Sequence, residues 1–179
     1  MHPQIRRALT ADLVSADLDA MRALFAAAWP DGDFSDDDFA HAMGGVHWLL
    51  EVDGRLLSHA SVVERVLEAD GVPLRTGYVE AVATQPTAEG RGYGSAVMTE
   101  AGDHIRAGYE LGALGTGRIS FYRRLGWEAW RGPSFVRTPD GPVRRPDDDG
   151  WILVLRTPRT PPIDLGLSLS CDWRPGDVW

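Results

Sequence analysis

The order of predicted elements in this 179-residue chain indicates one domain, residues 1–179, with a mixed α/β (α+β) fold. Strand-like segments joined by short turns dominate the first half, which is the pattern of antiparallel hairpins. A strand, a glycine-rich loop, a helix and another strand follow in the middle of the chain. Together these observations predict a mixed, mostly antiparallel central sheet flanked by helices.

A strand and two helices are expected in the first quarter of the chain. Residues 5–8 form a short first strand, and Ser15 or Asp17 caps the helix that follows. The apolar residues of that helix recur at helical spacing, and they are Leu18, Met21, Leu24, Phe25 and Ala28. A proline and a glycine then interrupt the pattern, and Ser35 caps a second, short helix that stops at Gly44.

Three strands are expected before the glycine-rich loop. Residues 46–52 and 56–67 form two antiparallel strands, because the Asp-Gly pair between them is a hairpin signal. The Ala-Asp-Gly sequence at residues 69–71 makes the next turn. Residues 78–84, which are rich in small and β-branched side chains, form the third of these strands.

The second half of the chain alternates between strands and helices. A short helix ends at Gly126, its natural C-cap, and the proline- and aspartate-rich residues 139–150 are expected to form a loop. The expected elements are, in order, a helix over 95–107, a strand over 111–114, a helix over 119–125, a strand beginning at 127–130, and strands over 151–155 and 165–171.

The loop at residues 89–94 reads Glu-Gly-Arg-Gly-Tyr-Gly and carries the strongest chemical signal. Glycines let main-chain N–H groups turn toward an anion, and the N-terminus of the following helix adds partial positive charge. A pyrophosphate suits such a loop, although glycine spacing alone also fits a flexible connection. A P-loop is excluded because no lysine precedes Ser95, and a dinucleotide fingerprint is excluded because several antiparallel strands precede the loop.

Composition excludes several classes of protein. The net charge of −8 makes nucleic acid a poor partner, because phosphate binding needs a basic stripe, and it favours a cationic ligand. No stretch of about 18 consecutive apolar residues exists, so no membrane span is expected. The N-terminus lacks the apolar core of a signal peptide, so a cytoplasmic location is expected. The single cysteine, Cys171, excludes an internal disulfide and a cysteine metal cluster, and its expected role is a small buried side chain.

Two motifs resemble those of the GNAT acetyltransferases. The first is the loop at 89–94 between a strand and a helix, and the second is the Phe-Tyr-Arg-Arg-Leu-Gly-Trp sequence at 121–127. The resemblance implies the GNAT fold, in which the central sheet is splayed at a bulge. It also implies acetyl-CoA as co-substrate and no metal. Glu89 departs from the family, which has Gln or Arg there, and Arg91 is expected to supply the missing positive charge.

Segments spread over nearly the whole chain are similar to the aminoglycoside 2'-N-acetyltransferases. The most specific is the C-terminal stretch 171–179, Cys-Asp-Trp-Arg-Pro-Gly-Asp-Val-Trp, which has no general structural reason to recur. The other segments are 32–34 followed by Asp38, 44–45, 77–80, 108–114 and 146–149. The resemblance implies transfer of acetyl from acetyl-CoA to the 2'-amino group of aminoglycoside antibiotics.

The same resemblance implies the residues of the site. Glu80 is the general base that takes a proton from the amine, directly or through water, and Tyr122 is the general acid that protonates or hydrogen-bonds the departing CoA sulfur. A main-chain N–H near Val82 polarises the thioester carbonyl. The implied CoA contacts are Val82, Ala83, Thr84, Glu89, Gly90, Arg91, Gly92, Tyr93 and Gly94. The implied substrate contacts are Asp33, Asp38, Glu80, Ala81, Gly115, Asp147, Asp148, Asp177 and Trp179, the last through a terminal carboxylate.

Other functions stay open at this level. A GNAT enzyme for another small amine, such as a polyamine, an amino sugar or a cell-wall metabolite, would share the fold, because function is set by the site. A non-catalytic module that binds CoA or a cation as a sensor is a second alternative, and the presence of both Glu80 and Tyr122 argues against it. By position alone, Glu80 is equally a carboxylate on the wet face of a strand, and Tyr122 is a packed aromatic. The resemblance further implies a homodimer, with the strands after Trp127 available to pair between subunits.

Overall fold

The structure is a computed structural model, and it describes residues 2–179 in two compact units. The first unit contains residues up to 63 together with 79–101, and the second contains 64–78 and 102–179. Two strands and one helix contribute residues to both units, namely β3 (Arg55–Ala69), β4 (Val72–Thr84) and α3 (Tyr93–Gly108). The single domain expected for residues 1–179 stays a prediction.

The first unit contains the predicted antiparallel hairpin. β1 (Gln4–Leu9) pairs with β2 (Val46–Val52), and β2 pairs with the first part of β3. The β2–β3 turn consists of Asp53 and Gly54, whose φ angles are +51° and +74°. Two-residue hairpin turns of this kind require positive φ at both positions, which is why the Asp-Gly pair identified the turn in the sequence.

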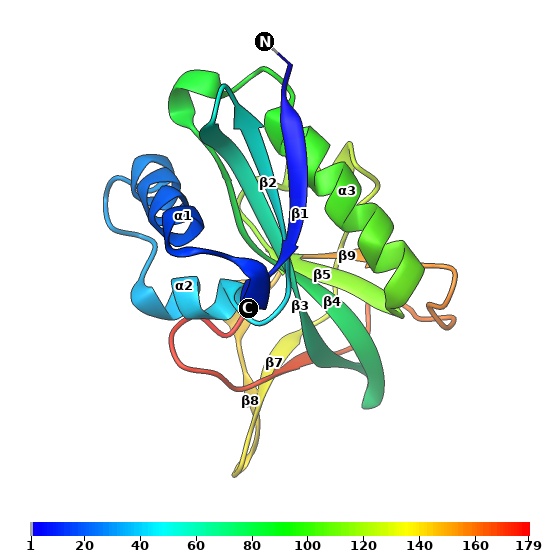
Figure 1. The fold of residues 1–179 in the computed structure, drawn as a ribbon. Helices are drawn as coiled ribbons and strands as arrows, with labels where there is room; N and C mark the ends of the chain where they lie inside the picture. The colour runs from blue at the N-terminus through cyan, green and yellow to red at the C-terminus, as the bar shows by residue number, and fades with distance from the viewer. Residues whose placement is uncertain (1) are drawn as a thin grey trace. The chain divides into compact units, whose positions relative to one another are not determined.

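Helix α1 (Ser15–Ala28) attaches to this sheet through the predicted apolar stripe. Met21, Leu24 and Phe25 are at most 3% exposed, and they pack with Leu49 of β2 in one apolar cluster. Burial of side chains of this size stabilises the fold by about 1.5–3 kcal/mol each. In Figure 1, α1 and the next helix lie on the same side of β1 and β2.

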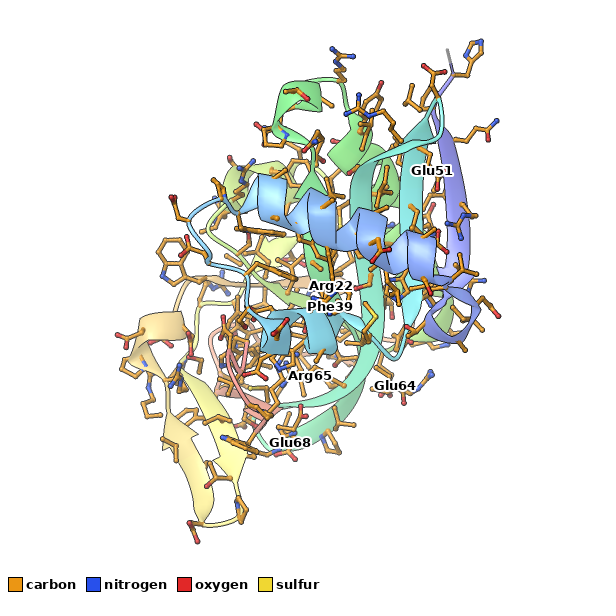
Figure 2. The ribbon with its side chains drawn as sticks, turned by 60° about the vertical axis from the view of Figure 1, so that its left-hand side comes forward. Arg22, Phe39, Glu51, Glu64, Arg65 and Glu68 are labelled. Atoms are coloured by element: carbon orange, nitrogen blue, oxygen red, sulfur yellow. The ribbon has the colours of Figure 1, made fainter. Side chains whose placement is uncertain are left out.

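Helix α2 (Asp36–Ala42) begins at the predicted cap. The Ser35 Oγ atom accepts a hydrogen bond from the Asp38 N–H at 3.2 Å, and the Asp38 carboxylate accepts one from the Ser35 N–H at 2.7 Å. This reciprocal arrangement satisfies two N–H groups that the helix itself leaves without partners. The two helices also meet through Arg22 of α1, whose guanidinium lies 3.9 Å from the centre of the Phe39 ring of α2 (Figure 2).

The second unit contains parallel as well as antiparallel strand pairs. β4 runs parallel to β5 (Leu111–Gly115), and β10 (Leu169–Asp172) runs parallel to β7 (Ser134–Thr138). The antiparallel pairs are β5 with β9 (Ile152–Arg156), β9 with β6 (Glu128–Ala129), β7 with β8 (Gly141–Arg144), and β10 with β3. This mixture confirms the predicted fold class, a mostly antiparallel mixed sheet with helices.

Two glycines let the C-terminal part of α3 approach the strands of the second unit. A Cβ atom at Gly77 in β4 would lie 2.9 Å from the Ile105 side chain, and one at Gly112 in β5 would lie 2.9 Å from Leu155. Contacts this short do not occur between real side chains, so both glycines are required by close packing rather than by a turn.

Several elements differ from the sequence-based expectation. β4 begins at Val72 rather than at residue 78, and β10 begins at Leu169 rather than at residue 165. The predicted loop 139–150 contains β8, so that expectation was wrong in part. The strand was hidden because Pro142 and the half-exposed Val143 give it no apolar alternation. Proline is tolerated at the edge of a sheet, which is where β8 lies.

The remaining helical segments are short. They are η1 (Thr10–Asp12), η2 (Pro86–Ala88), α4 (Ile119–Arg123) and η3 (Pro146–Asp148). Among the helices of residues 2–179, none combines the length and the apolar character needed to cross a membrane.

Candidate active site

Strand β4 changes direction at the residue that follows Glu80. Ala81 has a φ of +51°, in the left-handed region, which costs an L-residue about 1–2 kcal/mol. Two side chains of β3 bind the main-chain oxygens at this point. The His59 Nδ1 atom lies 2.8 Å from the Ala81 oxygen, and Ser61 Oγ donates to the Glu80 oxygen at 3.2 Å. The irregularity is the kind of strand bulge that the GNAT resemblance implied.

Residues after the bulge lead directly to the glycine loop. Ser58 Oγ donates to the Ala83 oxygen at 2.9 Å and lies 2.8 Å from Thr84 Oγ1. Ala83 is only 3% exposed, and its expected contact with CoA stays a prediction. The side chains of Glu80, Ala81, Val82 and Thr84 are partly buried on the same strand segment.

The glycine loop has the conformation that an anion site needs. Gly90 and Gly92 have φ angles of +76° and +82°, and a Cβ atom at either position would meet no atom within 4 Å. Glycine is therefore required there by the main-chain conformation, and the space beside the loop is open. α3 begins at Tyr93, two residues earlier than expected, and its first bond runs from the Ala96 N–H to the Gly92 oxygen. The N–H groups before Ala96 are those that a helix start leaves available.

The two acidic residues of the first unit that were predicted to contact substrate differ in burial and in hydrogen bonding. Asp33 lies exposed in the loop before α2. Asp38 is partly buried, and its Oδ2 atom already accepts from both the N–H and the Oγ of Ser35. Its role in capping α2 is therefore established by contacts, and its role toward a substrate stays a prediction.

A pocket of about 250 Å³ is lined by residues of α1, of α2 and of the loop between them. The loop residues Gly32 and Phe34, which flank Asp33 in the sequence, are among them. Its walls include the rings of Phe25, Trp29, Phe34 and Phe39. Arg22 and Asp36 also line the pocket and pair with each other at 3.4 Å. The paired charges cancel, so the pocket offers aromatic faces rather than a net negative site.

In the second unit, Tyr122 is held on α4 with its ring buried. The side chain is 7% exposed, and burial raises its pKa above the ordinary value for tyrosine, although Arg118 and a hydrogen bond with Thr116 oppose the shift. The helix ends as predicted, because Gly126 has a φ of +89° and the Trp127 N–H donates to the Tyr122 oxygen at 3.2 Å. A phenol with a raised pKa stays protonated at neutral pH and donates a hydrogen bond.

Buried Arg65 of β3 organises the C-terminal stretch. Its side chain is 5% exposed and donates to the Asp172 carboxylate at 3.0 Å and to the Val178 oxygen at 2.9 Å. The Cys171 thiol donates to the same Val178 oxygen at 3.3 Å. Burial raises the pKa of Cys171 to about 11, so this thiol is a packed side chain, as expected, and not an activated nucleophile.

Three predicted substrate contacts come together at the end of this stretch. A Cβ atom on Gly115 would lie 3.3 Å from the main-chain carbonyl carbon of Trp179. The Trp179 N–H donates to Asp177 Oδ1 at 3.2 Å. The Trp179 indole is 6% exposed, and its Nε1 atom is buried with no hydrogen-bond partner among residues 2–179. A buried donor without a partner is costly, so it marks a position where a ligand oxygen would be stabilising.

A cation that the sequence reasoning missed, Arg145, directly precedes the acidic loop 146–149. Arg145 Nε donates to Asp148 at 2.9 Å, and its pKa is raised by this bond, by Asp148, and by the nearby charges of Asp177 and Asp147. Arg145 therefore connects the three aspartates that were predicted to bind substrate in this unit. Asp149, the remaining acid of the loop, is used structurally.

Asp149 holds the base of the β7–β8 hairpin. It accepts from Arg144 and from the N–H and Oγ of Ser134, the latter two at 3.0 and 2.9 Å. The Arg144 bond lowers the pKa of Asp149 to about 2. Among the residues that the structure describes, no group of three or more His, Cys, Asp or Glu side chains could hold a metal ion.

The buried residues that sequence reasoning missed share one signal. Arg65 stands on the buried phase of β3, together with Leu67 and Ala69, and His47 and His59 are wholly buried in β2 and β3. Charged and imidazole groups on the apolar phase of a strand need fixed partners, because burial without hydrogen bonds is costly. That placement, rather than any motif, was the signal available in the sequence.

Comparison with known proteins identifies the family. The family model of the acetyltransferase (GNAT) domain matches residues 7–130. An aminoglycoside 2'-N-acetyltransferase of Mycolicibacterium fortuitum is 40% identical over 174 residues, which are 95% of this chain and 89% of the relative.

Solved structures agree with this assignment at the level of the fold. A GNAT acetyltransferase of Brucella melitensis in complex with acetyl-CoA has a TM-score of 0.61 and 21% identity, with 91% of this chain and 94% of that chain covered. The GNAT acetyltransferase YhbS of Escherichia coli in complex with CoA has a TM-score of 0.65 and 16% identity, with 96% and 89% covered. The chain therefore belongs to the GNAT acetyltransferases, in the family of the aminoglycoside 2'-N-acetyltransferases.

Proposed function

We propose that this protein transfers the acetyl group of acetyl-CoA to the 2'-amino group of aminoglycosides. One observation carries the proposal: Glu80 directly precedes the β4 bulge, in a chain that is 40% identical over 95% of its length to an enzyme named for this reaction. The positive φ at Ala81 supports the assignment of a main-chain N–H, that of Val82, and the Glu80 carboxylate as the pair of groups that acetyl transfer to an amine needs.

Each catalytic group has a defined task. Glu80 accepts the proton that the substrate ammonium must lose before its nitrogen can attack, directly or through water. The Val82 N–H polarises the carbonyl oxygen on which negative charge develops. Tyr122 donates a hydrogen bond to the departing sulfur. Because burial raises the pKa of Tyr122, hydrogen bonding to the thiolate is favoured over complete proton transfer.

Acetyl-CoA would supply the acetyl group as a thioester, and the chain offers a loop that fits its diphosphate. The fit rests on the positive φ angles of Gly90 and Gly92, the open space beside them, and the helix that starts at Tyr93. We assign the CoA contacts to main-chain groups of residues 82–84 and of the loop 89–94. Glu89 and Arg91 are both exposed.

The acidic residues and the tryptophan are assigned to the aminoglycoside. We assign its ammonium groups to Asp33, Asp38, Asp147, Asp148 and Asp177, and we assign Gly115 and Trp179 as further contacts of the substrate. A net charge of −8 supports this preference for a polycation. Arg145 lies among three of these aspartates, so we expect substrate ammonium groups to compete with it for the same carboxylates.

The direct test is an acetylation assay of the purified chain with acetyl-CoA and matched aminoglycosides that carry either an amino or a hydroxyl group at the 2' position. Release of the CoA thiol and the mass of the product are measured, with a polyamine and glucosamine as further acceptors. Turnover of the 2'-amino compounds alone is the expected result. Turnover of only the polyamine or glucosamine would assign the enzyme to another amine, and CoA binding without any turnover would make it a sensor.

Two broader properties belong to the same proposal. An enzyme of this kind acts where acetyl-CoA is available, so we propose a cytoplasmic location. We also propose a homodimer, which sedimentation equilibrium of the purified chain tests directly. A mass of about 39 kDa, twice the 19.6 kDa of the chain, would support it, and a mass of one chain would exclude it.

A further inference from the structure

A line of hydrogen bonds crosses the interior of the first unit and ends at the β4 bulge. Thr10 Oγ1 lies 2.8 Å from His47 Nε2, His47 Nδ1 lies 3.0 Å from His59 Nε2, and His59 Nδ1 lies 2.8 Å from the Ala81 oxygen. Both imidazoles have an exposed fraction of 0%. The line is unusual because the neighbouring core residues, such as Leu49, are apolar.

The direction of every bond in this line follows from its last member. A carbonyl oxygen only accepts, so His59 Nδ1 carries the proton and His59 Nε2, in a neutral ring, accepts. His47 Nδ1 must then donate to His59, and His47 Nε2 must accept from the Thr10 hydroxyl. Burial lowers the pKa of His47 to about 4 and that of His59 to about 3, so both rings are neutral at physiological pH.

The far end of the line is also fixed. Thr10 Oγ1 accepts from the Gly44 N–H at 2.9 Å and from the Gly45 N–H at 3.2 Å. Gly45 packs directly against the main chain of β3, because a Cβ atom there would lie 2.0 Å from the Val62 oxygen. The Thr10 Oγ1 atom also lies 3.3 Å from the Gly45 oxygen, but His47 Nε2 is the closer acceptor at 2.8 Å. The hydroxyl proton is therefore directed to His47, and the line has a single polarity from Gly44 to Ala81.

The Ala81 oxygen shares its peptide group with the Val82 N–H. The peptide is planar and trans, so its C=O and N–H point in opposite directions. Whatever holds the Ala81 oxygen also aims the Val82 N–H. The left-handed conformation of Ala81 is unfavourable for an L-residue, so it needs contacts that stabilise it, and His59 Nδ1 contacts its oxygen at 2.8 Å.

We propose that His59, supported by His47 and Thr10, is the positioning residue that aims the Val82 N–H at the acetyl carbonyl. The inference rests on the proposed function, since Val82 has that role only in acetyl transfer. In this proposal the two imidazoles, each in one fixed tautomer, orient the peptide group between Ala81 and Val82. They act through Ala81 and do not contact the substrate.

The wild-type protein allows a first test that needs no activity. In protein labelled with ¹⁵N-histidine, we expect two imidazoles with protonated Nδ1 and unprotonated Nε2, unchanged between pH 8 and pH 6. Spectra of His47→Gln and His59→Asn assign them. A protonated Nε2 on either ring, or a cationic ring at pH 6, would overturn the proposal.

The second test compares two replacements of His59. In His59→Asn the amide nitrogen stands near the position of Nδ1 and keeps the donor, whereas His59→Phe keeps the ring without it. We expect kcat to fall about 100-fold in His59→Phe, as for loss of an oxyanion donor, with KM for acetyl-CoA within about threefold. His59→Asn should recover at least about tenfold of that loss. Equal kcat values for the two variants, or a change confined to KM, would overturn the proposal.

Two controls separate positioning from stability and from the proposed function. Leu24→Ala weakens the apolar cluster that contains Leu49 without removing a hydrogen bond. Its kcat, measured at a temperature well below the unfolding midpoint of the variant, should match that of the wild type. Crystal structures of the His59 variants should retain positive φ at Ala81 in the Asn form and lose it in the Phe form; positive φ in both would overturn the proposal. A wild-type chain that acetylates no aminoglycoside would contradict the proposed function. The imidazole tautomers and the φ angle of Ala81 would still show whether His59 holds the Ala81 peptide group.

Discussion

Arg65 donates from Nη1 to the carbonyl oxygen of Val178 at 2.9 Å, although 113 positions separate the two residues. The same guanidinium binds both the carboxylate and the main-chain oxygen of Asp172. A rigid fork of donors suits this task, because one side chain satisfies acceptors at both ends of the C-terminal stretch. The most specific sequence motif of the chain is thus held in place by a residue outside it.

Arg65→Met should loosen the C-terminal stretch and raise KM for the aminoglycoside by about tenfold, with a smaller effect on KM for acetyl-CoA. Methionine keeps most of the length of the side chain but leaves the Val178 oxygen without its donor, and the unfolding free energy should fall by about 1–3 kcal/mol. Steady-state kinetics and urea unfolding measure both effects. The control is Arg156→Met, which breaks a half-exposed pair with Glu128. Equal shifts of both KM values in Arg65→Met would mean that the stretch is purely structural.

Gly115→Ala should disturb the same region more mildly. The new Cβ atom would lie 3.3 Å from the Trp179 carbonyl carbon and 3.4 Å from its oxygen, so the main chain must shift by a few tenths of an ångström. A cost of about 1 kcal/mol corresponds to about a fivefold rise in KM for the aminoglycoside. Gly108→Ala is the matched control, because no atom lies within 4 Å of its added Cβ. If both variants bind substrate as the wild type does, Gly115 is not close to the substrate.

Local signals in the sequence predicted most of the fold. The Asp53-Gly54 turn and the Gly126 cap depend on positive φ, and the Ser35 cap depends on a hydroxyl that binds a free N–H of the helix; all three are confirmed. β8 was missed because an exposed edge strand needs no apolar alternation, and Pro142 argued against it. Elements with a special main-chain requirement are readable in a sequence, whereas elements stabilised only by their neighbours are not.

The residues of the candidate site also fall into those that the sequence predicted and those that it did not. Glu80 and the loop 89–94 were found because their residue types recur in a motif, and the structure adds the bulge at Ala81. Arg65 and Arg145 were not found, because each acts through a partner that is distant in sequence or through a local charge balance. A single sequence does not contain the pairing of β3 with β10, and the role of Arg65 depends on it.

Glu80→Gln should remove the general base while keeping the shape of the side chain. We expect kcat/KM to fall by about 10²–10⁴-fold and to lose its rise with pH, because an amide does not accept the proton of the substrate ammonium. The pH–rate profile between pH 6 and pH 9 measures the effect. Glu51→Gln, which changes a partly exposed carboxylate of β2 that pairs with Arg6 (Figure 2), is the control. A variant with the same pH profile as the wild type would exclude Glu80 as the base.

Tyr122→Phe should lower kcat by about 100-fold with little change in KM, because its hydroxyl acts on the leaving sulfur rather than in binding. The acid is active when protonated, and burial raises its pKa above 10. The wild-type kcat should therefore show no alkaline decline from this residue up to about pH 10. Tyr109→Phe, another buried tyrosine with a raised pKa, serves as the control. An alkaline decline below pH 9 that disappears in Tyr122→Phe would contradict the assignment.

The buried imidazoles should make the protein sensitive to mild acid. An unfolded histidine has a pKa near 6.5, whereas burial lowers the pKa of folded His47 to about 4 and of folded His59 to about 3. As the pH falls below 6.5, the unfolded chain takes up protons that the folded chain does not, so the free energy of unfolding decreases. Each histidine adds a slope of about 1.4 kcal/mol per pH unit, fully developed between pH 6 and pH 4.5.

Urea unfolding at pH 7, 6 and 5 measures this loss of stability. The slope should be smaller by about 1.4 kcal/mol per pH unit in His47→Gln and again in His59→Asn, and unchanged in His2→Gln, whose side chain is exposed. A decrease of stability that runs parallel in the wild type and in the double variant would mean that the two rings are not held neutral. The same neutral rings are the basis of the hydrogen-bond line to Ala81, so unfolding at equilibrium and the imidazole spectra test one property by independent means.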